Sequence, residues 1–151
     1  NAFCVKQLNE KIAIMRQDPV LFNDTLRNNL TMYRDICDDE LIALLQKLNL
    51  HKFATQEGLD SMIREGGSNL SGGERKRIAL ARTLLRKAPI TIIDEPLANV
   101  DSETAEKIED ILTELSGGVV FVITHHFSDD KKKAFAKEFR FSHNHMERGG
   151  I

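Results

Sequence analysis

The sequence predicts an α/β fold in which helices cover a largely parallel sheet. Two short apolar runs, at residues 90–93 and 119–124, are typical of strands that are buried on both faces. Stretches with the apolar spacing of amphipathic helices precede and separate these runs. Because strands that alternate with helices usually pair in parallel, these observations together favour a layered α/β domain.

Length and composition agree with one globular unit. The chain has 151 residues, 41% of them hydrophobic and 29% charged, which is enough to form a core. Its 21 basic and 23 acidic residues give a net charge of −2, which does not favour nucleic acid or an anionic membrane as main partner. Cys4 and Cys37 fit neither a disulfide framework nor a paired zinc motif, so a reducing compartment is the simpler expectation. No apolar run approaches the ~20 residues of a membrane-spanning helix.

The first half of the chain predicts a strand, a helix and a loop. Residues 11–15 predict a strand that ends near Gln17, because Pro19 disfavours its continuation. Acidic residues at the start and leucines at helical spacing predict a helix over residues 38–49. Residues 56–70 contain three glycines and predict a loop with little regular structure.

The second half predicts two more helices around the two apolar strands. One helix is expected over residues 73–87, and Asp101 can cap another that ends before Gly117. The six basic residues between positions 75 and 87 fit a solvated helix face better than a nucleic-acid stripe, so we expect no nucleic-acid partner. Over the last ~25 residues we expect a helix end and a short strand, and a solvated charge run at residues 131–133. The phenylalanines of these two elements are Phe135, Phe139 and Phe141.

Two adjacent acids, Asp94 and Glu95, directly follow the apolar run at residues 90–93. Parallel α/β sheets bind ligands at the carboxyl ends of their strands, so these side chains are candidates for a site. Asp94 would hold Mg²⁺ through its water shell, and Glu95 would orient and deprotonate a water molecule. The alternative is a solvated strand end, and the pattern alone leaves both interpretations open.

A possible anion-binding segment lies directly before the helix expected at residue 73. Ser71 offers a hydroxyl, and Gly72 and Gly73 let backbone amides approach a ligand at a helix start. The alternative is an ordinary N-capped helix after a loop, which a bare Ser-Gly-Gly would favour.

Five motifs follow one another in order over residues 12–126. Gln17 lies in Arg-Gln-Asp-Pro-Val-Leu-Phe, residues 70–74 read Leu-Ser-Gly-Gly-Glu, and residues 90–95 form the apolar run with its two acids. Residues 97–101 read Leu-Ala-Asn-Val-Asp and residues 123–125 read Ile-Thr-His. In this order they resemble the Q-loop, signature, Walker B strand, D-loop and switch histidine of the nucleotide-binding domain of ATP-binding cassette (ABC) proteins.

The resemblance implies a P-loop NTPase (RecA-like) parallel sheet with an inserted α-helical signature subdomain. Residues from about 18 to 87 would form the helical/signature subdomain, and residues 1–17 and 88–151 the remainder of the RecA-like core. It also implies two cassettes arranged head to tail, with ATP and Mg²⁺ between the P-loop of one and the signature of the other. The signature would contribute Leu70, Ser71, Gly72, Gly73 and Glu74 to nucleotide binding.

The resemblance assigns the remaining roles residue by residue. Glu95 would be the catalytic base, His125 would contact the γ-phosphate, and Gln17 would sense Mg²⁺ and the attacking water. Asp94 would bind Mg²⁺, and Asp101, in the D-loop, would belong to the nucleotide site and couple the two sites. These roles agree with phosphoryl transfer, in which positioning and charge neutralisation do most of the work.

The sequence departs from the family at the P-loop. None of its nine glycines is followed by lysine, so the Gly-x-x-x-x-Gly-Lys-Ser/Thr pattern is missing. Because the chain also begins with Asn1, we expect the C-terminal part of a cassette that does not form a complete ATP site alone. The missing P-loop strand predicts an uncovered sheet edge.

The implied function is that of an ATPase domain that drives a membrane transporter, at the cytoplasmic side of the membrane and with transmembrane domains as partners. The segment after Gln17 and the Glu-Gly-Gly at residues 65–67 favour export, whereas Glu95-Pro96-Leu97 is more typical of importers. Two alternatives remain. A chromosome- or repair-type ABC ATPase is disfavoured because residues 18–70, 53 in all, leave no room for a long coiled coil. A catalytically silent interaction module is favoured only by the missing P-loop.

Overall fold

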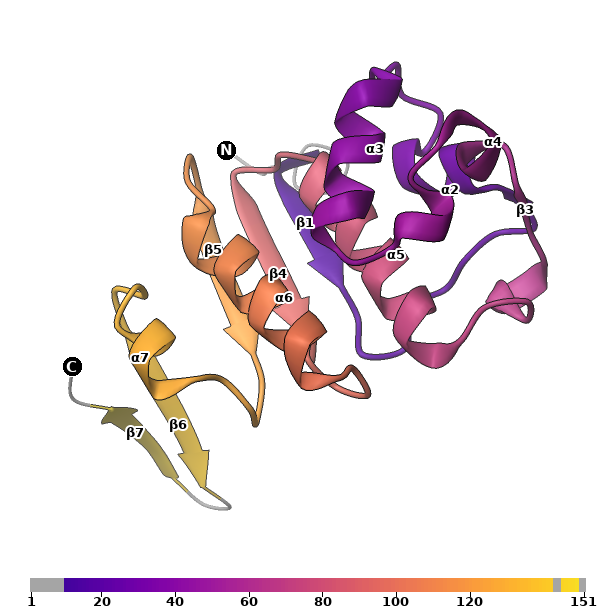
Figure 1. The fold of residues 1–151 in the computed structure, drawn as a ribbon. Coiled ribbons are helices and arrows are strands. Elements are labelled where there is room, and N and C mark those ends of the chain that lie inside the picture. The colour runs from indigo at the N-terminus through magenta and orange to yellow at the C-terminus, as the bar shows by residue number, and fades with distance from the viewer. Residues whose placement is uncertain (1–9, 143–144, 150–151) are drawn as a thin grey trace.

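The computed structural model describes residues 10–142 and 145–149, and a three-stranded parallel sheet lies at its centre (Figure 1). The strands, in spatial order, are β1 (Ile12–Met15), β4 (Ile90–Asp94) and β5 (Val119–Ile123). In the parallel register Ile14 lies opposite Ile92, and Ile92 lies opposite Phe121, so these three side chains share one face. The predicted α/β fold with a parallel sheet is confirmed.

Two helices cover one face of this sheet. The first, α5 (Gly72–Leu85), packs against β1 and β4, and the second, α6 (Ser102–Glu114), joins the same core through Ile108 and Leu112. On the covered face Met15 and Ile93 are fully buried, and burial of such side chains is the main stabilising contribution to a domain of this size. Both helices start and end within two residues of the predicted bounds.

The opposite face of the sheet is open in the described part of the chain. Ile14, Phe121 and Ile123 expose 56%, 50% and 53% of their surface. The prediction of burial on both faces is therefore wrong for the run at residues 119–124, because the described helices pack on one face only. In the run at residues 90–93, Thr91 and Ile93 are buried and Ile90 and Ile92 are partly buried. Among the described residues β5 pairs with β4 alone, so this part of the chain has the uncovered sheet edge that was predicted.

A group of shorter helices lies beside the sheet, on the right in Figure 1. The predicted helix over residues 38–49 is confirmed as α3 (Asp38–Lys47), whereas the neighbouring α2 (Leu26–Thr31) and the short strand β2 (Asp24–Thr25) were not predicted. A buried side chain explains α2: Asn29 accepts a hydrogen bond from the Phe22 N–H and donates to the carbonyls of Phe22, Asp24 and Thr25. It thereby ties α2 to the segment that follows Gln17.

The prediction of an irregular loop over residues 56–70 is wrong. This segment contains three short elements, α4 (Gln56–Leu59), β3 (Met62–Ile63) and the 3-10 turn η2 (Glu65–Gly67), and follows another 3-10 turn, η1 (His51–Phe53). Thr55 caps α4 by accepting the Gly58 N–H at 2.9 Å, and β3 pairs with β2 in antiparallel orientation. Local capping and a long-range strand partner supply the order that glycine content did not predict.

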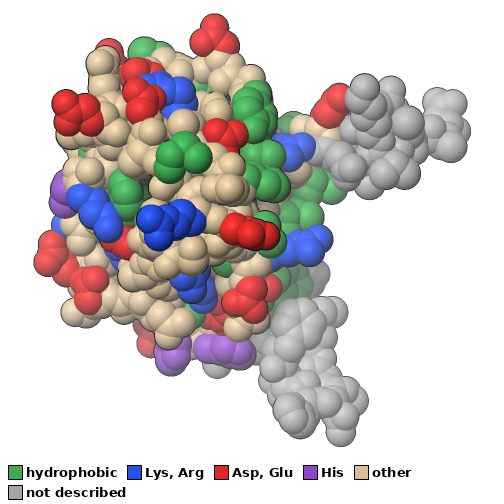
Figure 2. Space-filling view, turned by 90° about the vertical axis from the view of Figure 1, so that its right-hand side faces the viewer, with side chains coloured by type: hydrophobic (Ala, Val, Ile, Leu, Met, Phe, Trp, Pro, Cys, Tyr) green, Lys and Arg blue, Asp and Glu red, His purple; other side chains and the backbone are tan. Residues whose placement is uncertain are grey.

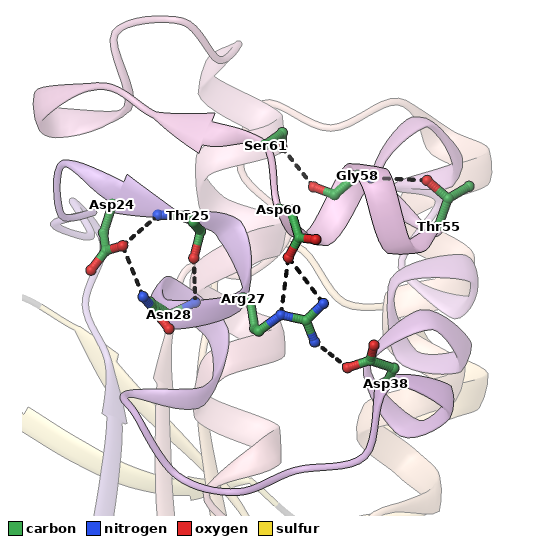
Figure 3. Close-up of polar contacts among 9 residues, drawn as sticks. All are labelled: Asp24, Thr25, Arg27, Asn28, Asp38, Thr55, Gly58, Asp60 and Ser61. Carbon is green, nitrogen blue, oxygen red and sulfur yellow. Dashed lines mark hydrogen bonds and ion pairs between the residues drawn. The ribbon is translucent and has the colours of Figure 1, made fainter.

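One arginine joins three of these helical elements (Figure 3). Arg27, in α2, donates through Nε and Nη2 to Asp60 at 3.1 and 3.0 Å, directly after α4. Its third nitrogen, Nη1, pairs with Asp38 at the start of α3. A planar guanidinium with several donors suits such a junction, because one side chain satisfies two carboxylates.

The C-terminal region contains the short helix α7 (Asp129–Lys132) and a hairpin of β6 (Glu138–Ser142) and β7 (His145–Gly149). The hairpin lies beyond β5 and forms a separate sheet (Figure 1). Phe139 and Phe141 fall within β6, the predicted short strand. Phe135 lies in a bend three residues after α7, so its prediction as part of a helix end is wrong. The prediction that residues 131–133 are simply solvated is wrong for Lys131, whose side chain is 22% exposed and paired with Asp110.

Cys37 is exposed and carries a free thiol, and Cys4 lies outside the described residues. Within residues 10–142 and 145–149, no helix has both the length and the apolar character that crossing a bilayer requires.

Candidate functional site

Glu95 and His125 meet where β4 and β5 end. Asp94 lies opposite Ile123 in the parallel register, so the residues that follow both strands emerge side by side. The Glu95 N–H donates to the Ile123 carbonyl at 2.8 Å, which continues the pairing by one step. His125 Nε2 lies 3.5 Å from Glu95 Oε1. The structure therefore brings together two residues that the sequence predicted for the same site.

The two side chains have very different surroundings. The Glu95 side chain is 12% exposed, whereas that of His125 is 89% exposed. Glu95 has a φ of +48°, in the left-handed region that is uncommon for a residue other than glycine. Backbone strain of this kind is concentrated at functional sites. A shielded carboxylate beside an accessible imidazole can hold a water molecule and accept its proton.

Gln17 and Asp94 both lie where the carboxyl ends of the strands are. Met15 is paired with Ile93, so the chain after β1 leaves the sheet level with the end of β4. Gln17 is exposed two residues beyond β1, and Asp94 is partly exposed as the last residue of β4. Amide and carboxylate oxygens are suitable ligands for Mg²⁺, which usually binds one or two carboxylates together with waters and phosphate oxygens. These donors fit that ion.

The signature segment forms the start of α5 through a complete capping box. The Ser71 hydroxyl accepts the Glu74 N–H at 3.2 Å, and the Glu74 carboxylate accepts the Ser71 N–H at 2.8 Å. The amides of Gly72 and Gly73 have no acceptor within the helix, because the first N–H groups of a helix have no carbonyl behind them. The segment thus offers several donors to an anion.

Lys52, from η1, compensates the negative charge within this segment. Its Nζ lies 2.6 Å from Glu74 Oε1. Burial of Glu74 disfavours its ionised form, but hydrogen bonds from Lys52 and Ser71 outweigh this effect and hold its pKa below the ordinary value. Nothing in the sequence pairs Lys52 with Glu74, and only the folded structure reveals this contact.

Leu70 has a different position from the rest of the signature. Its side chain is 7% exposed and belongs to the core. Its N–H donates to Gly67, and its carbonyl accepts from Arg75 Nη1 at 3.0 Å. Leu70 therefore anchors the loop, and the donors that face solvent belong to the residues that follow it.

The D-loop segment lies against the signature helix. A Cβ built on Gly73 would lie 3.2 Å from the Asn99 carbonyl oxygen and 3.9 Å from Val100. Asp101 caps α6: its carboxylate accepts the Thr104 N–H at 2.9 Å and the Thr104 hydroxyl at 2.8 Å. These two hydrogen bonds hold the pKa of Asp101 below its ordinary value.

The predicted residues therefore form two clusters. Gln17, Asp94, Glu95 and His125 lie at the carboxyl ends of the strands, and the signature residues lie with the D-loop at the start of α5. The hydrogen bonds and ion pairs of Ser71 and Glu74 run to each other and to Lys52, so they do not connect the clusters.

Comparison with known proteins agrees with this geometry. The family model described as ABC transporter matches residues 3–98, which include Gln17, residues 70–74, Asp94 and Glu95. The chain belongs to the ABC transporter family. The family that the sequence motifs indicated is confirmed.

This ABC transporter chain is similar to two curated relatives. It is 41% identical over 125 residues to the ATP-dependent lipid A-core flippase of Syntrophus aciditrophicus (strain SB), covering 80% of this chain and 21% of the flippase. It is also 41% identical over 126 residues to ABC transporter C family member 12 of Dictyostelium discoideum, covering 82% of this chain and 10% of that protein.

One solved structure resembles the ABC transporter chain in fold as well as in sequence. The structure of a bacterial Atm1-family ABC exporter with ATP bound matches with a TM-score of 0.71 and 32% identity. The match covers 80% of this chain and 22% of the exporter chain. The predicted P-loop NTPase fold is confirmed by this match. The chain spans about a fifth of the flippase and of the exporter, and less of the Dictyostelium protein.

Proposed function

We propose that the chain forms part of an ATPase cassette in which Glu95 and His125 act on the γ-phosphate of ATP during transport across a membrane. The observation that carries this proposal is the 3.5 Å approach of His125 Nε2 to Glu95 Oε1 at the ends of two paired parallel strands. In this proposal residues from about 18 to 87 are the helical/signature subdomain, and residues 1–17 and 88–151 belong to the RecA-like core.

The proposed chemistry follows from the side chains at the carboxyl ends of the strands. Glu95 acts as the base that orients the attacking water and accepts its proton, and His125 donates a hydrogen bond to the oxygens of the transferred phosphoryl group. Gln17 orients the water, and Asp94 holds Mg²⁺, which neutralises charge on the phosphate oxygens when it is bound. Because His125 is exposed, it is accessible to a nucleotide held by another chain segment.

The signature residues serve a second nucleotide site in this proposal. The hydrogen bonds and ion pairs of Ser71 and Glu74 do not reach Glu95. In this proposal residues 71–74 therefore bind the phosphates of a nucleotide held by a second cassette. Asp101 follows Asn99 and Val100, which lie against Gly73, and couples the two sites. The partner is therefore another nucleotide-binding domain in a head-to-tail pair. Support comes from the helix-start donors of α5 and from Lys52, which offsets the charge of Glu74.

Transmembrane domains are the other proposed partner, at the cytoplasmic side of a membrane. A pocket of about 640 Å³ between β1, the segment that follows it and α5 offers a docking surface. Its lining includes the exposed apolar residues Val20, Phe22 and Met32 beside Arg82. Figure 2 shows the molecule from the side of α4 and β3, where acidic and basic side chains are interspersed and hydrophobic ones gather towards the right-hand margin. The flippase and exporter relatives favour export over import.

The test is ATP binding and turnover by the purified chain in three forms: alone, mixed with an intact cassette that carries its own P-loop, and joined to the P-loop segment of a related cassette. We expect negligible turnover by the chain alone, because its sequence offers no Gly-Lys pair for the phosphates. In the mixture we expect ATP-dependent association and added turnover of the nucleotide held by the intact cassette. In the joined chain, where the nucleotide lies at Glu95, we expect turnover that Glu95→Gln lowers by about 10²–10⁴-fold. Turnover by the joined chain that Glu95→Gln leaves unchanged would refute the catalytic role of this site. Association without added turnover would favour the alternative of a silent interaction module.

A further inference from the structure

Glu109, in α6, is a buried carboxylate that the proposed mechanism does not use. The residue is 4% exposed, and an ionised group with so little contact with water is unfavourable unless it is fully hydrogen-bonded. Oε1 accepts the backbone N–H of Ser128 at 2.8 Å, and Oε2 accepts the Ser128 hydroxyl at 2.7 Å. Both oxygens therefore bind one residue that lies 19 positions further along the chain.

Ser128 ends the segment that carries His125. This segment follows β5 and is fixed at its start by Thr124, whose hydroxyl accepts the His126 N–H at 3.1 Å and donates to the His126 carbonyl at 2.9 Å. Phe127 packs edge-to-face on Phe135, with ring centroids 5.4 Å apart, and borders the core. Glu109 fixes the far end through Ser128. The backbone on both sides of the histidine is thus held.

The imidazole itself has little to hold it. His125 is 89% exposed, and among the described residues its polar contact is the 3.5 Å approach to Glu95. Because its own surroundings do not fix the ring, its position depends on the backbone of the segment from Thr124 to Ser128. Among the described residues, Glu109 is the only one of these anchors that lies in α6.

Lys131 supports this anchor from α7. Its Nζ lies 3.8 Å from Glu109 Oε2, 2.7 Å from Asp110 Oδ1 and 2.9 Å from the Glu106 carbonyl. The neighbouring Lys133 is 75% exposed, in contrast to 22% for Lys131. The basic run therefore contains one lysine that bridges α6 and α7 and offsets the charge of Glu109.

We infer that Glu109 is a positioning residue for His125: by holding Ser128 on α6, it keeps the histidine beside Glu95. The inference rests on the proposed function for what His125 does there, whereas the contact itself can be tested without nucleotide. Removing the carboxylate loosens one end of the segment, because the Ser128 carbonyl then remains bound to the Lys131 and Lys132 amides of α7 but no other described hydrogen bond ties Ser128 to α6. This loosening lets His125 move away from the phosphate position.

The first experiment uses the 151-residue chain without nucleotide. Amide hydrogen exchange at Ser128 and backbone relaxation at His125 are measured by NMR for wild type and Glu109→Ala. We expect exchange at Ser128 to accelerate by about tenfold or more and His125 to become more mobile, because one buried hydrogen-bond acceptor is lost. Glu109→Gln can still accept the N–H and donate to the hydroxyl, so we expect it to remain near wild type.

The matched control is Asp110→Ala, which removes the neighbouring carboxylate and its Lys131 pair but leaves Ser128 bound. We expect it to change neither signal at residues 125–128. Ser128→Ala keeps the backbone bond and loses the hydroxyl bond, so it provides a milder variant in case Glu109→Ala does not fold. Unprotected Ser128 in wild type, or equal exchange in wild type and both variants, would overturn the inference.

The second experiment measures turnover by the chain joined to the P-loop segment of a related cassette, in which the nucleotide lies at Glu95 and His125. We expect Glu109→Ala to lower kcat by about tenfold with KM for ATP changed less than about twofold, because the histidine acts on the transition state. Glu109→Gln should restore most of kcat, which a nonspecific loss of folded protein would not explain. Equal kcat values for Glu109→Ala and Asp110→Ala would contradict the positioning role. If Glu95→Gln also leaves turnover unchanged, the proposed function fails, and the exchange experiment still decides the Ser128 contact.

Discussion

At the residue scale, Gly72 and Gly73 are adjacent but are required for different reasons. A Cβ on Gly73 would lie 3.2 Å from the Asn99 carbonyl oxygen and 3.3 Å from Arg77 Nη1, so packing within the chain opposes any side chain there. A Cβ on Gly72 would find its nearest neighbour, Arg75 Nη2, at 3.9 Å. Packing therefore does not account for glycine at position 72, whereas a phosphate approaching the helix start would.

The two alanine variants separate these reasons. Gly72→Ala should stabilise the chain by up to about 1 kcal/mol, because alanine favours the helix and its Cβ makes no close contact. Gly73→Ala should lack this gain, since Asn99 or Arg77 must shift. In the mixture with an intact cassette, Gly72→Ala should still lower ATP-dependent turnover. Urea unfolding and turnover are the two measurements. Full turnover by a stabilised Gly72→Ala variant would show that this helix start does not contact phosphate.

At the scale of elements, the start of α6 connects the D-loop to the helical part. The Asp101 carboxylate accepts both donors of Thr104, whose hydroxyl in turn accepts from Asn49 Nδ2 at 2.9 Å, directly after α3. One capping side chain thus orders the helix start and a contact between two helices. The helix could be predicted from Asp101 and its apolar spacing, but the contact with Asn49 could not, because it depends on the tertiary fold.

This cap should make the stability of the chain depend on pH. The pKa of Asp101 is lowered in the folded state, so its contribution is complete above the unfolded pKa and is lost as pH falls through the folded pKa. Asp101→Ala should therefore destabilise the chain at neutral pH, and its difference from wild type should shrink on acidification below about pH 4. The check is urea unfolding across this range, with Glu114→Ala, exposed at the other end of α6, as control. A difference that does not depend on pH would argue against the charged cap.

At the scale of the whole molecule, the sheet and the candidate site at the carboxyl ends of its strands could be predicted from the sequence, but the exposure of one sheet face could not. One apolar run ends in Asp94-Glu95 and the other is followed by His125. Once these two strands pair in parallel, Glu95 and His125 must meet. The short helix α2 and strand β3 were missed because their order comes from Asn29 and from a strand partner far along the chain. Burial on the second face was wrongly predicted because residue type does not reveal whether anything packs there.

The open sheet face should make the isolated chain self-associate. This face consists of Ile14, Val119, Phe121 and Ile123, each at least half exposed, and a contiguous apolar patch favours association in water. We expect sedimentation velocity to show concentration-dependent association that Ile14→Thr and Phe121→Thr reduce. Met62→Thr is the matched control, since Met62 is 55% exposed, as against 56% for Ile14, but lies in β3 away from this face. Association that the control reduces as much as Ile14→Thr would place the contact elsewhere.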